Sequence, residues 1–202
     1  VAGELSDIYH DVAKHRLYTD PANSLRRRST QTALHRMFGS LCKILAPILA
    51  FTADEAWEFI CPGTAGSVHQ LAWQPMRFQR AEAEQVAWKA LFELRELALP
   101  ELEKARQAKA IGKALEAKLT CAGSSPALTA AQAHLEFLRE LLNVSQLEIK
   151  PGVDGALAVL VAKAEGDKCE RCWHWETDVG ARPEHPSLCG RCVKAVQESA
   201  RA

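Results

Sequence analysis

Apolar residues recur at helical spacing in the first half of the chain. A helix is predicted over Ser24–Leu49, because apolar residues there follow one another at steps of three and four, the repeat of one helical face. The stripe consists of Leu34, Phe38, Leu41, Leu45 and Ile48. Pro47 should end or kink this helix, since proline lacks the N–H that an interior helical position donates.

Two shorter helices are predicted on either side of this one. A stripe of Leu5, Ile8, Val12 and Leu17 predicts a helix at the start of the chain. No capping residue precedes it, which favours a segment taken from a longer protein over a self-contained chain. The other helix is predicted over Thr52–Ile60, where Thr52 and Glu55 have the spacing of a capping box.

The pattern changes after a long helix predicted over residues 81–110. That helix has its apolar stripe at Val86, Ala90, Leu94 and Leu97. Pro100 should bend it. Strands are then predicted over Glu116–Cys121, Val144–Ile149 and Ala156–Ala162, with a helix between the first two whose stripe is Leu128, Ala131, Leu135, Leu138 and Leu142. Mixed strands and helices indicate a small α/β unit.

We therefore expect a mainly α protein in three parts. The first is a helical bundle over residues 1–80. The second, over residues 81–165, is a helix with a small α/β junction unit. The third is a cysteine-rich module over residues 166–202. A chain of 202 residues is long enough for one good core and a satellite module.

Composition and charge exclude several classes of protein. The 25 basic and 25 acidic residues cancel, so contact with nucleic acid would need a local patch. No apolar run approaches the roughly 18 residues that a membrane helix needs, and the start lacks signal-peptide anatomy. The seven cysteines are read as free thiols and metal ligands of a cytoplasmic protein. No histidine has a paired carboxylate or serine arrangement, so no catalytic residue is predicted.

The strongest chemical signal is the stretch CERCWHWETDVGARPEHPSLCGRC, residues 169–192. Two residues separate Cys169 from Cys172, and two separate Cys189 from Cys192. Such pairs, at this distance along the chain, bring four thiolates into one tetrahedron, which is typical of a structural zinc site. We predict one zinc ion with these four cysteine ligands.

Other interpretations of this module stay open on the sequence alone. The cysteine pairs are also compatible with redox CxxC motifs, and His174 or His185 with replacement of one cysteine ligand. Trp173 and Trp175 either pack over the zinc turns as a small core or offer a stacking face to an unpaired base. In an extended backbone these two indoles would share a face. Gly190 lies in the second turn, where we expect the backbone to need positive φ.

The same residues resemble a known family. CxRCWxW followed by DVG and HPxLCxRC is similar to the zinc finger of bacterial isoleucyl-tRNA synthetases and of the formamidopyrimidine class of DNA glycosylases. Upstream, DVAKHRLYTD and RRSTQTALHRMFGSLCKILAPILAFTADEAWEFI resemble the anticodon-binding helical domain of class I synthetases, as do SVHQLAWQPM and KAIGKALEAKLT the segments that follow. The resemblance covers nearly the whole chain and is strongest to the isoleucyl enzymes.

This resemblance implies a C-terminal portion of an ATP-dependent isoleucine–tRNA ligase. The HIGH-type and KMSKS-type motifs of the catalytic domain do not occur in the sequence, nor does the editing domain, so we expect no isoleucine activation by this portion alone. Its implied partners are the anticodon stem-loop of isoleucine tRNA and the catalytic body in cis. A monomer that does not bind membranes is expected.

Unpaired RNA is bound by cations on phosphates and by planar groups on bases. On that basis the resemblance implies RNA contacts by Lys14, Arg16, Arg26, Arg27, Arg28, Arg171, Trp173, Trp175, Arg182 and Arg191. Simpler roles compete: an ion pair with Asp11 for Lys14 or Arg16, and a solvated helix end or a pair with Asp20 for the arginine run.

Two other functions are compatible with these motifs. One is a DNA-binding or repair module of the glycosylase type, although Val1-Ala2 is not the Pro-Glu start of that class. The other is a zinc-stapled protein-interaction domain, which the neutral net charge allows. Salt-dependent RNA binding would separate the tRNA hypothesis from the last one.

Overall fold

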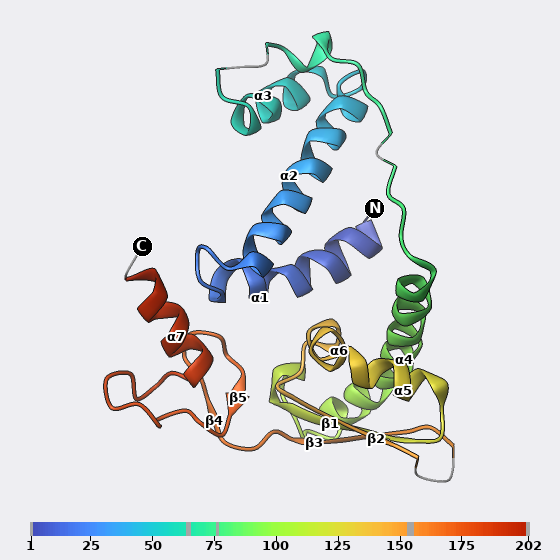
Figure 1. Cartoon of the computed structure of the whole chain (residues 1–202), viewed down its shortest axis with the longest axis vertical. Helices are drawn as coiled ribbons and strands as arrows, with labels where there is room; N and C mark the ends of the chain where they lie inside the picture. The colour runs from blue at the N-terminus through green and yellow to red at the C-terminus, as the bar shows by residue number, and fades with distance from the viewer. Residues whose placement is uncertain (1, 64–65, 76, 153–155, 201–202) are drawn as a thin grey trace. The chain divides into compact units, whose positions relative to one another are not determined.

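The chain is mainly α-helical, and its computed structural model describes residues 2–63, 66–75, 77–152 and 156–200 (Figure 1). It forms two compact units. The first consists of residues 1–19 and 80–202, and the second of residues 20–79. Among the described residues, no helix has the length and apolar character needed to cross a bilayer.

The second unit contains helices α2 (Leu25–Leu45) and α3 (Ala50–Ile60) and the short helix η2 (Val68–Gln70). Helix α2 ends two residues before Pro47, as predicted. The capping box at Thr52 is wrong, since α3 begins at Ala50 after Leu49, with no side-chain cap. The turn that follows α2 already bonds the Leu49 N–H to the Leu45 carbonyl, so the backbone enters the helix earlier than the polar pattern suggests.

The core of the second unit is small. Cys42, Ala46, Ala53, Trp57 and Val68 are its buried residues. The predicted α2 stripe is only partly covered: Phe38 is 44% exposed and Ile48 is 79% exposed. The buried side of α2 is therefore centred one position further along, where small residues allow close approach of α3.

The first unit begins with the π-helical segment η1 (Ala2–His10) and helix α1 (Asp11–Thr19). Its longest helix is α4 (Glu82–Gln107), which continues through Pro100. Proline cannot donate a backbone hydrogen bond, yet the buried side of α4, with Ala98 before and Leu102 after the proline, is uninterrupted. The short helix η3 (Ala114–Glu116) then leads into the sheet.

The first unit contains a three-stranded sheet in the order β2-β1-β3. Strand β1 (Ala117–Gly123) pairs in parallel with β2 (Gln146–Pro151) and antiparallel with β3 (Ala158–Lys163). All three strands were predicted within about two residues, the usual uncertainty of element ends.

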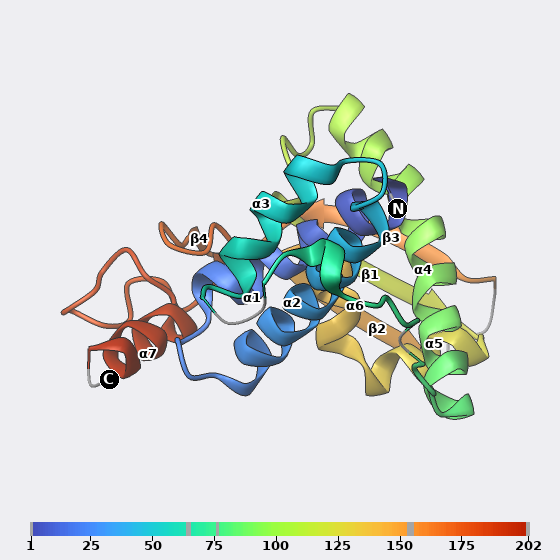
Figure 2. The same cartoon turned by 90° about the horizontal axis from the view of Figure 1, so that it is seen from above.

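The crossover between β1 and β2 differs from the prediction. The sequence predicts one helix, whereas the structure has α5 (Pro126–Ala133) and α6 (Leu135–Leu142), separated at His134 with φ −124°. Leu128, Ala131, Leu138 and Leu142 are nevertheless all buried. The break redirects the chain so that both halves of the stripe reach the core, and α5 lies beside α4 (Figure 2).

The N-terminal segment shares the core of this unit. Leu94, Leu119 and Leu138 are fully buried in it, and Ile8 and Val12 pack against the same cluster. The apolar residues at the start of the chain thus pack on a core whose other residues lie about 80 positions or more further along the sequence.

The end of the chain forms the cysteine-rich module. It contains the two-residue strands β4 (Asp167–Lys168) and β5 (Trp175–Glu176), which pair antiparallel, and helix α7 (Gly190–Ser199). Its buried cluster is the four cysteines with Val179 and Leu188 beside them. So small an apolar cluster cannot stabilise a fold by burial alone.

Candidate metal centre and nucleic-acid interface

Four cysteines meet in the C-terminal module. Cys169 and Cys172 follow β4, Cys189 caps α7, and Cys192 lies in the first turn of that helix. Their sulfur atoms all lie within 4.8 Å of one another, and each residue is at most 5% exposed. Four buried thiols at this distance fit one tetrahedral zinc ion and leave no open position.

The first cysteine turn is tight and strained. The Trp173 N–H donates to the Cys169 carbonyl (2.8 Å), and the Cys169 N–H donates to the His174 carbonyl (2.9 Å). Trp173 has φ +64°, which is uncommon for a residue with a bulky side chain. The left-handed residue reverses the chain, so both sulfurs of the pair point to one place.

The second cysteine turn opens helix α7. Asp178 accepts a hydrogen bond from the Gly190 N–H (2.9 Å), which satisfies one of the orphan donors of the helix start. Gly190 does not have the positive φ expected from the sequence. Glycine is favoured there by space, because a Cβ would lie 2.6 Å from Asp178 Oδ2.

Asp178→Ala is expected to lower the free energy of unfolding of the zinc-loaded module by about 1 kcal/mol, the usual effect of losing a helix cap. Zinc release during denaturant unfolding would measure it, with Asp178→Asn as a control that keeps an acceptor. In the double variant, Gly190→Ala should cause little further loss of stability beyond that of Asp178→Ala. Each substitution breaks the same hydrogen bond, between the Asp178 carboxylate and the Gly190 N–H. Losses of stability that add fully in the double variant would contradict this explanation.

Hydrogen bonds and burial shift the pKa values of the cysteine thiols in opposite directions. Burial raises the pKa of Cys169, but N–H groups of Cys172, Cys189 and Arg171 outweigh it and lower that pKa to about 7. A hydrogen bond with Cys189 lowers the pKa of Cys172, but one with Cys192 and burial outweigh it and raise that pKa to about 11. A divalent cation binds the thiolate form of each cysteine, so metal binding displaces protons from the cluster.

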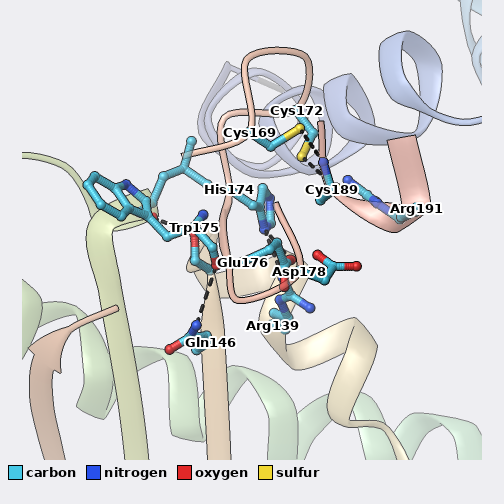
Figure 3. A network of polar contacts seen from close by, with 12 residues as sticks. Arg139, Gln146, Cys169, Cys172, His174, Trp175, Glu176, Asp178, Cys189 and Arg191 are labelled. Carbon is cyan, nitrogen blue, oxygen red and sulfur yellow. Dashed lines mark hydrogen bonds and ion pairs between the residues drawn. The ribbon is translucent and has the colours of Figure 1, made fainter. Parts of the chain in front are cut away.

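The histidines of the module are not in the ligand group. Within the described part of the chain, the four cysteines are the group whose ligand atoms lie close enough for one ion. Nδ1 of the buried His174 lies 3.0 Å from Arg139 Nη2, and Arg139 also pairs with Glu176. Figure 3 shows this network next to the cysteines. His174 is therefore a neighbour of the metal site that ties it to α6.

Sequence reasoning missed this network because its partners are far apart in the chain. Arg139 and His174 are separated by 35 positions. Ser145, fully buried, donates to the Leu115 carbonyl and accepts from the Trp175 N–H. Such residues cannot be recognised from a local sequence pattern, because their hydrogen-bond partners lie far away in the sequence.

The two tryptophans have different surroundings. Trp173 is 60% exposed, whereas Trp175 is half-buried in β5 with Lys163 Nζ 5.1 Å from its ring centroid. The extended backbone assumed in predicting a shared face is wrong, because Trp173 has a left-handed backbone conformation and the alternation of a strand does not apply. Neither indole belongs to the buried cysteine cluster.

Of the predicted cations in the module, two make contacts within the first unit. Arg171 donates to the Thr19 carbonyl, and Arg191 Nη2 lies 3.2 Å from His15 Nδ1. Arg182 is exposed. The first two therefore join the cysteine module to helix α1.

The predicted cations of α1 also differ. Lys14 is exposed and lies 3.3 Å from Asp11 on the same helix. Arg16 is half-buried, lies 2.6 Å from Glu140 of α6, and has its guanidinium 5.6 Å from the Phe137 ring centroid. The Lys14–Asp11 ion pair is exposed and therefore weak. The Arg16 guanidinium, in contrast, is fixed by Glu140 and the Phe137 ring.

The arginine run at the start of α2 lies in the second unit. Arg26 forms an ion pair with Asp20 at 2.9 Å, the alternative that the sequence left open. Arg27 lies 3.4 Å from the Asp20 carbonyl. Arg28 is exposed. Arg26 and Arg27 thus both contact Asp20, and Arg28 is the exposed member of the run.

Comparison with known proteins gives two family matches. Residues 1–121 match the anticodon-binding domain of tRNA ligase. Residues 166–195 match the zinc finger found in FPG and IleRS. The second match and the buried cluster of four cysteines together make the module a zinc finger with one ion as its cofactor.

Curated relatives match along nearly the whole chain. An isoleucine–tRNA ligase of Gloeobacter violaceus is 40% identical over 209 residues, which cover 96% of this chain and 20% of that protein. The same enzyme of Neisseria meningitidis is 41% identical over 196 residues, and that of Caldicellulosiruptor saccharolyticus 35% over 198. The chain thus spans about a fifth of the length of these relatives. Because the anticodon-binding match covers more than half of the chain, the chain belongs to the family of anticodon-binding domains of tRNA ligases.

Proposed function

We propose that this chain is the tRNA-recognition portion of an isoleucine–tRNA ligase and holds the anticodon stem-loop of isoleucine tRNA. ATP-dependent activation of isoleucine and its transfer to tRNA then belong to the catalytic body of the same polypeptide. The family match over residues 1–121 and the zinc finger support this assignment. In the proposal the ligase acts as a cytoplasmic monomer without a membrane partner.

The observation that carries the proposal is the exposed indole of Trp173. It lines a hollow of about 450 Å³ together with Lys14, Tyr18 and Arg171. A large aromatic side chain held in solvent by a strained backbone is costly, and such strain gathers at functional sites. An unpaired base stacked on an aromatic ring gains about 1–3 kcal/mol. The zinc turn would hold this ring ready for one base of the anticodon loop.

The exposed cations are proposed to contact phosphates. Lys14, Arg28 and Arg182 are exposed, and the surface ion pair of Lys14 with Asp11 is weak, so their charges are open to an approaching RNA backbone. The other predicted residues are half-buried or contact a partner outside their own helical turn; they are Arg16, Arg26, Arg27, Arg171, Arg191 and Trp175. These we propose to position the interface more than to touch RNA.

The three parts predicted from the sequence are proposed as a division of roles. Residues 1–80 would bind the stem-loop, residues 81–165 would form a rigid junction, and residues 166–202 would read an unpaired base. The packing of Ile8 and Val12 on the junction core supports the view that the first two parts work together. The cysteine ligands Cys169, Cys172, Cys189 and Cys192 would hold the reading element in shape.

The two other functions have less support. A glycosylase-type DNA module accounts for the zinc finger but not for the match to anticodon-binding domains over residues 1–121. A protein-interaction domain without RNA would also explain an exposed indole, but it does not account for the same family match. Binding that weakens steeply with salt and differs between tRNAs would support the tRNA proposal over both.

Trp173→Leu is expected to weaken binding of isoleucine tRNA about tenfold, because an aliphatic side chain cannot stack on a base and stacking contributes about 1–3 kcal/mol. Trp173→Tyr, which keeps an aromatic ring, should retain most of the affinity. Fluorescence anisotropy with labelled isoleucine tRNA, and with the same tRNA carrying a changed anticodon, would measure both.

Equal affinity of Trp173→Leu and the unaltered chain would contradict the role of this indole. Failure of the folded, zinc-loaded chain to bind either tRNA would contradict the proposal that recognition resides in this portion of the ligase. Circular dichroism and zinc content serve as controls that each variant is folded and loaded.

A further inference from the structure

Arg171 joins the metal site to the end of helix α1. It stands inside the first cysteine turn, yet its Nη1 donates to the Thr19 carbonyl at 2.5 Å and its Nη2 lies 3.4 Å from the Tyr18 carbonyl. Tyr18 and Thr19 end α1, where helix carbonyls lack intrahelical donors. The guanidinium therefore caps a helix that precedes it by 152 positions.

The same guanidinium reaches a metal ligand. Arg171 Nη1 lies 3.7 Å from Cys192 Sγ, which comes from the other cysteine pair. Four thiolates around zinc carry a net negative charge, so a cationic N–H directed at one of them makes a charge-assisted contact. Donors of this kind orient the ligands of a metal and strengthen its binding.

His15 makes a second set of contacts between α1 and the cysteine turns. His15, one turn earlier in α1, has Nε2 3.2 Å from the Cys172 carbonyl and Nδ1 3.2 Å from Arg191 Nη2. A guanidinium can only donate, so Nδ1 accepts and Nε2 carries the proton that reaches the carbonyl. Both cysteine turns thus contact the C-terminal half of α1.

We propose that Arg171 is a positioning residue that couples the zinc–thiolate centre to the last turn of α1, so that this turn is firmly ordered only while the metal is bound. Without zinc, the thiols are no longer held together as a negative centre and the contact to Cys192 weakens. The guanidinium then loses the anchor that fixes it against the helix end.

The last turn of α1 lies where the chain leaves the first compact unit. Thr19 is the last residue of the first compact unit before the chain enters the second. The turn held by Arg171 is therefore at one of the two covalent junctions between the units. This role differs from the RNA contact predicted for Arg171 and does not depend on tRNA binding.

Hydrogen exchange of the whole chain, without RNA, tests the inference. In the zinc-loaded Arg171→Gln variant, amides of residues 15–19 are expected to exchange about fivefold faster than in the unaltered chain, the effect of losing a hydrogen bond worth about 1 kcal/mol. Arg182→Gln is the matched control, because it removes an exposed arginine of the same module. It should leave this exchange unchanged, and amides in α4 should be unaffected in both variants.

Zinc transfer to a coloured chelator gives an independent readout. Arg171→Gln should release zinc about tenfold faster than Arg182→Gln, as expected for loss of a donor outside the ligand shell. If Arg171→Gln does not retain zinc, Arg171→Lys takes its place in the exchange experiment. Lysine keeps the positive charge but cannot bond the Tyr18 and Thr19 carbonyls together. The inference is overturned if the zinc-loaded Arg171 variant exchanges residues 15–19 at the unaltered rate.

Discussion

Removal of zinc is expected to unfold the C-terminal module while the core around α4 and β1 stays folded. The module has a buried cluster of four cysteines, with Val179 and Leu188 beside it, too little apolar surface to offset the entropy of ordering its chain. Metal binding in zinc-finger peptides supplies on the order of 10 kcal/mol. The core of the first unit, by contrast, includes Leu91, Leu94, Leu119 and Leu138, all fully buried.

Two-dimensional NMR of the chain before and after chelation would measure this outcome. Amide signals of residues 166–199 should collapse to disordered positions, while those of α4 and β1 keep their dispersion. Cys172→Ser should reproduce the change without a chelator, because it removes one ligand of the ion. Cys61→Ser is the matched control: Cys61 lies outside the cluster, so zinc content should stay at one ion per chain. A module that keeps its dispersed signals without metal would contradict the prediction.

Gly166→Ala is expected to destabilise the zinc-loaded module by about 3 kcal/mol, near the upper end for single substitutions. Gly166 precedes β4 with φ +84°. A Cβ there would lie 2.6 Å from the carbonyl carbon of Glu176 and 2.8 Å from Thr177 Cα. Both obstacles are backbone atoms, so the β4–β5 pair must separate to make room. The strain of positive φ adds to this clash.

Gly180, in the same module, provides a matched control for this substitution. Its φ of +85° is nearly the same, but a Cβ there would meet only the Pro186 carbonyl oxygen, at an ordinary contact distance of 3.5 Å. Gly180→Ala should therefore cost only about 1 kcal/mol, the effect of backbone conformation alone. The midpoint of zinc release in denaturant would compare the two variants. Equal midpoints for both would show that the clash at Gly166 is relieved without loss.

The sequence was most informative where one local pattern decides the structure. The four cysteines were identified from their spacing alone, because two-residue separations bring sulfur atoms together whatever surrounds them. The three strands and the end of α2 before Pro47 were likewise predicted. Periodicity also identified the buried positions Leu128, Ala131, Leu138 and Leu142, although it did not reveal the break at His134.

Predictions failed where a neighbour distant in sequence sets the outcome. Trp173 and Trp175 were expected to share a face, but the cysteine turn forces Trp173 into a left-handed conformation. The stripe predicted over Ser24–Leu49 was expected to face the core, but Phe38 and Ile48 are exposed and Cys42 and Ala46 are buried instead. In both places local propensity is weaker than the constraint that the surrounding structure imposes.

By itself, the sequence determined the mainly α class, the zinc ligands and the resemblance to anticodon-binding domains, because these depend on residue type and spacing within short segments. The tertiary structure alone decided which cations remain exposed. Arg16 and Arg171 looked as accessible as Arg28 and Arg182, yet each is half-buried against a distant partner in the same unit. A charged side chain can enter a fold only when a distant group satisfies it, and no local pattern records where that group will be.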